Sequence, residues 1–172
     1  LCRSADAMTE PQSYYWDDLT VGWTYDFGPI EVDREEVLAF ARRYDPQPFH
    51  LDDEAAAQTH FGRLAASGWH SCAMMMGAMV ERWQQMPGWQ DQSLGAMGID
   101  ELRWRRPVFP GDRLRGTCEL IERIASRTRP EMGINKWRTT LINQNDEPVL
   151  SLVSIVMQKR RPPTSTADDE KY

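Results

Sequence analysis

Two prolines hold an acid and an imidazole at a short separation in the segment YDPQPFHLD, residues 44–52. Asp45 precedes Pro46, and His50 follows Pro48 by two residues. Because proline fixes its own φ and restricts the residue before it, this segment is stiff. A carboxylate and an imidazole so placed could orient one water between them, which general acid–base catalysis needs. The same residues also fit a turn capped by Asp45 and a histidine satisfied within the core.

The segment AASGWH, residues 65–70, is the second candidate. Its small residues, Ser67 and Gly68 among them, lead into an apolar helix, and the first N–H groups of a helix have no intrahelical acceptor. Directed at a cleft, they would stabilise a carbonyl oxygen that gains negative charge. A tight helix entry, with glycine present for close packing, explains the same pattern.

The histidines and cysteines do not form a recognisable metal site. The three histidines, His50, His60 and His70, are spaced by ten residues, which matches neither a helical HxxxH pair nor a zinc loop. The cysteines are odd in number and contain no CxxC pair. We therefore expect no metal, no disulfide framework and a reducing, cytoplasmic location.

Three helices are expected to position these residues. The first has an Asp33–Glu36 capping box and ends before Pro46. The second runs from Asp53 to about His60. The third covers residues 71–86, with Ser67 or Ser71 as its N-cap. Its apolar residues go all round the helical wheel, which predicts burial on nearly every side.

Strand patterns fill the second half of the chain. Apolar residues alternate with polar ones at residues 113–120 and 137–141, and residues 149–157 are apolar on both faces, as in a central or interface strand. Further strands fit residues 22–31 and 94–105. This order predicts an α+β fold in which an antiparallel sheet wraps around one long buried helix.

Length and composition set the outer limits. The 172 residues predict a single domain over residues 13–161, with disordered tails at residues 1–12 and 162–172. A mean hydropathy of −0.61 and the lack of a long apolar run argue against a membrane span, and residues 1–11 show no signal peptide. The net charge of −6 disfavours a nucleic-acid partner.

Three segments in order, YDPQPFHLD, FGRLAASGWH and ELRWRRPVFPGDRL, resemble the MaoC-like dehydratases, a hot-dog-fold family that includes (R)-specific enoyl-CoA hydratases. The resemblance covers about residues 16–160. The family motif Asp-x-Asn-Pro-x-His corresponds to residues 45–50, with Gln47 in place of the asparagine. Tyr44 stands where the hydratases commonly have a small residue.

The resemblance implies a hydro-lyase that adds water to trans-2-enoyl thioesters to give (R)-3-hydroxyacyl thioesters. It implies that Asp45 activates the water, that His50 binds the same water and helps to deliver a proton to C2, and that the Gly68 N–H binds the thioester carbonyl. Ser67 and Gln47 are the further candidates for oxyanion or substrate binding. No metal or redox cofactor is implied, since coenzyme A or an acyl carrier protein is part of the substrate. A homodimer or higher homo-oligomer is expected.

Other interpretations stay open. The same fold could carry an acyl-CoA thioesterase, which also uses a carboxylate, a water and a helix N-terminus. It could also be a non-catalytic acyl-thioester-binding protein. Arg103 and Arg105 alternate along a predicted strand and could meet the phosphates of coenzyme A or form a solvated face. The methionines and tryptophan of the third helix could line an acyl pocket or simply fill the core: Met74, Met75, Met76, Met79 and Trp83.

Overall fold

The computed structural model describes residue 11 and residues 13–163. The predicted tails therefore lie almost entirely outside the described residues. The elements follow the chain in this order: η1 (Trp16–Asp18, a 3₁₀ turn), β1 (Thr24–Glu31), α1 (Arg34–Tyr44), α2 (Pro48–Leu51), α3 (Asp53–Ala57), α4 (Gly68–Gln84), α5 (Trp89–Gln92), β2 (Ser93–Trp104), β3 (Arg113–Ala125), β4 (Met132–Ile142) and β5 (Pro148–Lys159).

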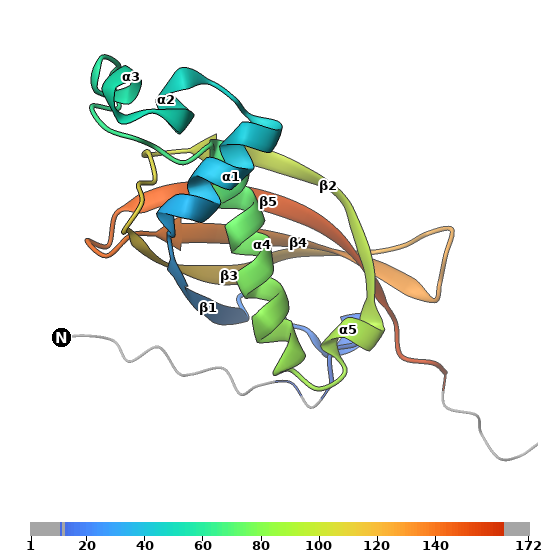
Figure 1. Cartoon of the computed structure of the whole chain (residues 1–172). Coiled ribbons are helices and arrows are strands. Elements are labelled where there is room, and N and C mark those ends of the chain that lie inside the picture. The colour runs from blue at the N-terminus through green and yellow to red at the C-terminus, as the bar shows by residue number, and fades with distance from the viewer. Residues whose placement is uncertain (1–10, 12, 164–172) are drawn as a thin grey trace, which may run out of the picture.

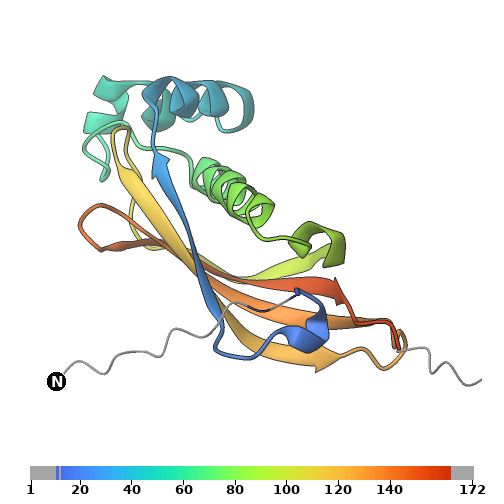
Figure 2. The same cartoon turned by 90° about the horizontal axis from the view of Figure 1, so that it is seen from below.

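The five strands form one antiparallel sheet in the order β1-β3-β4-β5-β2. The sheet curves beneath α4, while α1, α2 and α3 gather beyond the N-terminal end of that helix (Figures 1 and 2). This is the hot-dog arrangement of a sheet around one helix, so the predicted α+β class and architecture are confirmed. No helix in the described part of the chain is long and apolar enough to cross a membrane.

Alternation places the core on one face of the sheet. Leu114, Cys118 and Leu120 of β3 are buried, and the polar residues between them are exposed or half-buried. Phe27 of β1 lies against Gly116, where any side chain would collide with its ring. The strand at residues 149–157 is central, since β5 pairs with both β4 and β2. Its apolar residues are therefore covered mainly by other residues of the same chain.

The prediction that the third helix is buried on nearly every side is wrong for the single chain. α4 begins at Gly68 and packs one face on the sheet through Met75, Ala78 and Met79. On an adjacent face, Trp69 is 59% exposed and Met76 is 46% exposed. Apolar residues all round a helix show that all faces can be covered, but not that one chain covers them.

Hydrophobic periodicity did not identify the short helices. α2 and α5 have four residues each, too few to show a helical repeat. The helix expected from Asp53 to about His60 ends at Ala57, where Gln58 donates its N–H to Ala55 O and Ala56 O.

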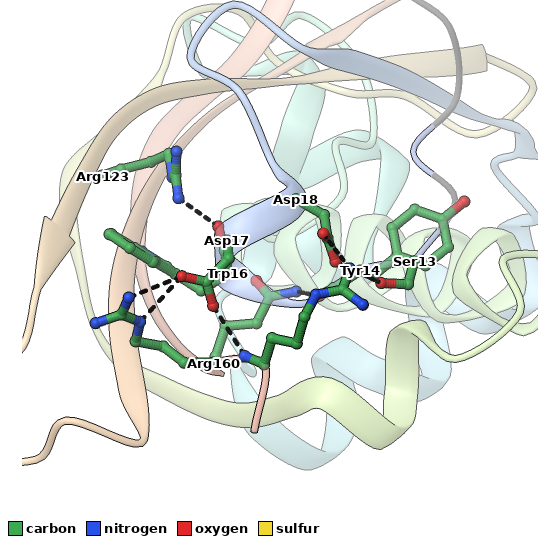
Figure 3. A network of polar contacts seen from close by, with 9 residues as sticks. Ser13, Tyr14, Trp16, Asp17, Asp18, Arg123 and Arg160 are labelled. Atoms are coloured by element: carbon green, nitrogen blue, oxygen red, sulfur yellow. Dashed lines mark hydrogen bonds and ion pairs between the residues drawn. The ribbon is translucent and has the colours of Figure 1, made fainter. Parts of the chain in front are cut away.

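The segment before β1 crosses the far end of the sheet and is held there by polar contacts (Figure 3). Trp16 lies between two guanidinium groups, 4.0 Å from Arg123 and 5.1 Å from Arg160, and its Nε1–H donates to Ile134 O. Arg160 also pairs with Asp17 at 2.9 Å. Tyr14 packs against Trp89 beside the C-terminal end of α4, which closes that end of the core.

Candidate active site

Asp45 is held where α1 ends. Its backbone N–H closes the last turn by donating to Ala41 O at 3.0 Å, and Pro46 prevents the helix from continuing. The backbone of Gln47 then donates to Asp45 O at 2.8 Å, which turns the chain back. The Asp45 side chain is 18% exposed. The carboxylate is thus fixed in a half-enclosed position.

His50 is carried by α2, which begins at Pro48. The ring is buried, and its Nδ1 lies 2.7 Å from Ala65 O. Because a carbonyl oxygen can only accept, Nδ1 is the donor in this bond. In the neutral form of the ring, Nε2 is therefore the acceptor, and this atom lies 3.5 Å from Asp45 Oδ2.

Asp45 receives a hydrogen bond on each carboxylate oxygen. Ser67 Oγ donates to Oδ2 at 2.7 Å, and Gln47 Nε2 donates to Oδ1 at 2.7 Å. Burial alone would raise the pKa of Asp45, but these two hydrogen bonds lower it below its ordinary value. The carboxylate is therefore ionised at neutral pH.

Ser67 joins Asp45 to the start of α4. It is the N-cap of this helix, and its Oγ accepts from Trp69 N at 3.2 Å while the hydroxyl donates to Asp45. The next residue, Gly68, has no hydrogen-bond acceptor for its N–H among the described residues. A Cβ on Gly68 would lie 2.5 Å from the indole of Trp104, so the close approach requires glycine.

These residues meet at a cavity of about 370 Å³. Asp45, His50 and Gly68 line it, together with the aromatic residues Phe61, Trp69 and Trp104 and the cations Arg105 and Arg106. A carboxylate, an imidazole acceptor and a free backbone N–H thus share one small space. Chemically, they can hold a water and a carbonyl oxygen side by side.

The predicted site residues divide into two groups. Asp45, His50 and Gly68 line the cavity, whereas Ser67 and Gln47 reach Asp45 and hold its carboxylate. Nothing in the sequence indicated that the Ser67 hydroxyl and the Gln47 amide would both bind Asp45. Trp104 was not predicted, because its approach to Gly68 depends on the pairing of β2 with β5.

Other candidates lie apart from the catalytic pair. His60 borders the cavity, and His70 stacks on Phe40 with ring centroids 4.7 Å apart. No cluster of His, Cys, Asp or Glu that could hold a metal occurs among the described residues. Tyr44 is 62% exposed and packs on Phe40, so the family's small-residue position faces solvent here.

The comparison with known families decides the identity. A family profile described as "MaoC like domain" matches residues 18–140, which is most of the chain. The chain belongs to the MaoC-like family. Membership of this hydratase and dehydratase family makes it a hydro-lyase.

Several MaoC-like relatives are similar over most of their length. The 3-hydroxybutyryl-CoA dehydratase of Methylorubrum extorquens is 31% identical over 73% of this chain and 75% of the relative. The crystal structure of a MaoC-like dehydratase from Rhodospirillum rubrum is 36% identical, with a TM-score of 0.77 over 87% of this chain and 99% of that one. The (R)-hydratase from A. caviae involved in PHA biosynthesis is 27% identical, with a TM-score of 0.63 over 84% and 98%.

Proposed function

We propose that this MaoC-like protein adds water to trans-2-enoyl thioesters, or removes it from the (R)-3-hydroxyacyl forms, with Asp45 and His50 holding the water. One observation carries the proposal: two acceptors, Asp45 Oδ2 and His50 Nε2, lie 3.5 Å apart at the cavity. Acceptors that face each other need a hydrogen donor. A water that donates one hydrogen to each satisfies both and keeps its lone pairs for C3 of the substrate.

The reaction follows from the groups around that water. Asp45 accepts a proton as the water oxygen bonds to C3, and the C2=C3 electron pair moves toward the thioester carbonyl. The Gly68 N–H donates to the carbonyl oxygen as negative charge develops there. The Asp45–His50 pair then returns the proton to C2. One water is added, the protein ends unchanged, and the scheme uses no metal or redox cofactor.

The carrier part of the substrate lies at the open side of the cavity. Arg105 and Arg106 line it, and guanidinium groups suit the phosphates of coenzyme A. The name of the Methylorubrum relative supports a coenzyme A thioester. An acyl carrier protein is the other carrier, and a parallel assay with carrier-linked substrate separates the two.

We also propose that two copies of the chain form a homodimer through β2 and α4. β2 is an edge strand and carries the exposed apolar residues Leu94, Met97 and Ile99. Trp69 and Met76 expose apolar surface on the neighbouring α4. An edge strand with an apolar face is a template for pairing, and a second copy would cover both.

The test is the loss of enoyl-thioester absorbance with a panel of short, long and branched trans-2-enoyl-CoAs. We expect Asp45→Asn and His50→Ala to lower kcat by about 10²–10⁴-fold, because each removes one acid–base group. Asp52→Asn is the matched control. It makes the same change two residues after His50, at the N-cap of α3, where asparagine caps equally well.

Three results would overturn the proposal. Release of free thiol without consumption of the double bond would make the chain a thioesterase. Full activity in Asp45→Asn would remove the acid from the mechanism. A folded wild type that is inert on every coenzyme A and carrier-linked substrate would leave an acyl-thioester-binding role.

A further inference from the structure

A second cavity lies along α4, one helical turn beyond the first. It has a volume of about 270 Å³ and lies between α4 and the sheet, where Met75, Met79 and Val156 line it. Its far end is closed by the aromatic rings of Tyr25, Trp83, Trp89 and Trp137. Its walls are largely apolar, so it suits hydrocarbon rather than a polar ligand.

The two cavities share no lining residue, although Ser71 of the first and Met75 of the second lie one turn apart on α4. Trp104, at the end of β2, lines the first cavity and is 47% exposed, while Ile99, five residues earlier on the same strand, lines the second. The indole of Trp104 rests on Gly68 and meets Trp69 edge-on, with ring centroids 5.2 Å apart.

We propose that Trp104 limits the length of the acyl chain that the catalytic cavity accepts. This inference rests on the proposed hydration of enoyl thioesters. The charged carrier stays toward solvent, so the acyl carbons beyond C3 take the apolar direction along α4. They meet the indole of Trp104 before they reach the second cavity.

The size of the first cavity supports a short chain. Its volume of about 370 Å³ is near the lower end of the range for ligand cavities, roughly 300–1,000 Å³, and the thioester must share it. A chain of about four to six carbons fits without moving Trp104. Longer chains need the indole to move away from Gly68.

The experiment compares kcat/KM for trans-2-enoyl-CoAs of four to ten carbons in the wild type and in Trp104→Ala. In the wild type, we expect kcat/KM to fall steeply beyond six carbons. In Trp104→Ala, we expect the ratio of ten-carbon to four-carbon kcat/KM to rise by about tenfold or more, because apolar carbons gain a cavity. Trp104→Leu makes the same comparison if the alanine variant does not fold.

A second substitution tests where the longer chain goes. Met79→Trp fills the second cavity from α4. Added to Trp104→Ala, it should abolish the gain for ten carbons. In the wild-type background it should leave the chain-length ratio unchanged, because the chain does not reach Met79.

Different results would refute the role of Trp104 as the limit on chain length, called the gate below, and the proposed function. A wild type that prefers ten carbons, or a Trp104→Ala ratio equal to that of the wild type, would refute the role of Trp104 while leaving hydration intact. A wild type without hydratase activity would refute the proposed function. Calorimetry with saturated butyryl-CoA and decanoyl-CoA then tests the gate alone. Tighter binding of decanoyl-CoA to Trp104→Ala supports it, and equal or absent binding by both proteins refutes it.

Discussion

At the scale of single residues, the hydrogen bonds around Asp45 explain how a partly buried acid serves as a base. Burial favours the neutral acid, while donors to each oxygen favour the carboxylate. The effect of the hydrogen-bond donors exceeds that of burial, so the pKa of Asp45 is lowered. A base with a low pKa is a weaker base, but it is ionised and correctly oriented whenever the substrate arrives. Ser67 and Gln47 therefore act as positioning residues.

Ser67→Ala tests this assignment. Loss of the donor to Asp45 Oδ2 raises the pKa of Asp45, so we expect the acid limb of the kcat/KM profile to move to higher pH. At neutral pH, kcat/KM should fall by roughly 10- to 100-fold, the usual value of a hydrogen bond to a charged group. Ser67→Thr, which keeps the hydroxyl and the helix cap, should retain the wild-type profile. An unshifted acid limb in Ser67→Ala would show that Ser67 serves only the helix.

The sequence indicated which residues line the cavity better than it indicated the contacts between them. Asp45 and His50 share a stiff segment, and Gly68 lies at a helix entry, so local patterns made all three candidates, and the family resemblance supplied their expected roles. The bond from Ser67 to Asp45 spans 22 residues. The contact of Trp104 with Gly68 requires the register of β2 on β5. Neither relation has a local signal, because the fold alone brings these segments together.

At the scale of elements, α1 and α4 meet through an unusual contact. His70 of α4 is 6% exposed and stacks on Phe40 of α1, and its Nδ1 has no hydrogen-bond partner among the described residues. Burial lowers the pKa of His70, although the charge of Glu36 raises it. The ring is thus packed as a neutral aromatic group. The mechanism does not use it.

His70→Phe should therefore change how stability depends on pH. Unfolded histidine protonates near pH 6.5, and folded His70 protonates only at lower pH. Between these values the unfolded chain binds more protons, so the wild type loses stability as pH falls below about 6.5. We expect a smaller loss in His70→Phe, measured by urea unfolding at about pH 7.5 and about pH 5.5. His60→Phe, the same change at an exposed histidine, controls for the substitution. An equal loss in wild type and His70→Phe would contradict the assignment.

Period and length decided which elements the sequence could predict. β3 and β4 were identified from alternation at residues 113–120 and 137–141, which covers part of each strand. α2 and α5 have four residues each and offer no period. α4 was identified, but its burial was overestimated, because hydropathy does not distinguish the core of one chain from a surface covered by another.

At the scale of the whole molecule, much of the exposed apolar surface lies along β2 and on α4. Met97 and Ile99 on β2 are more than half exposed, and so is Trp69 on α4. Trp69 also lines the catalytic cavity. A second copy that covers this surface would reduce the access of water to the site. Assembly and catalysis are then linked in the proposed enzyme.

Met97→Glu tests assembly through β2. A carboxylate on the apolar edge must be desolvated in a dimer, so we expect the dimer to dissociate at least tenfold more readily. Sedimentation equilibrium would detect this as a shift toward the 19.9 kDa monomer mass. Val21→Glu is the matched control, since Val21 is 52% exposed and Met97 is 58% exposed, but Val21 precedes β1 at the other edge of the sheet. Val21→Glu should remain dimeric. A monomeric wild type, or a Met97→Glu dimer as stable as that of Val21→Glu, would show that the β2 edge does not form the interface.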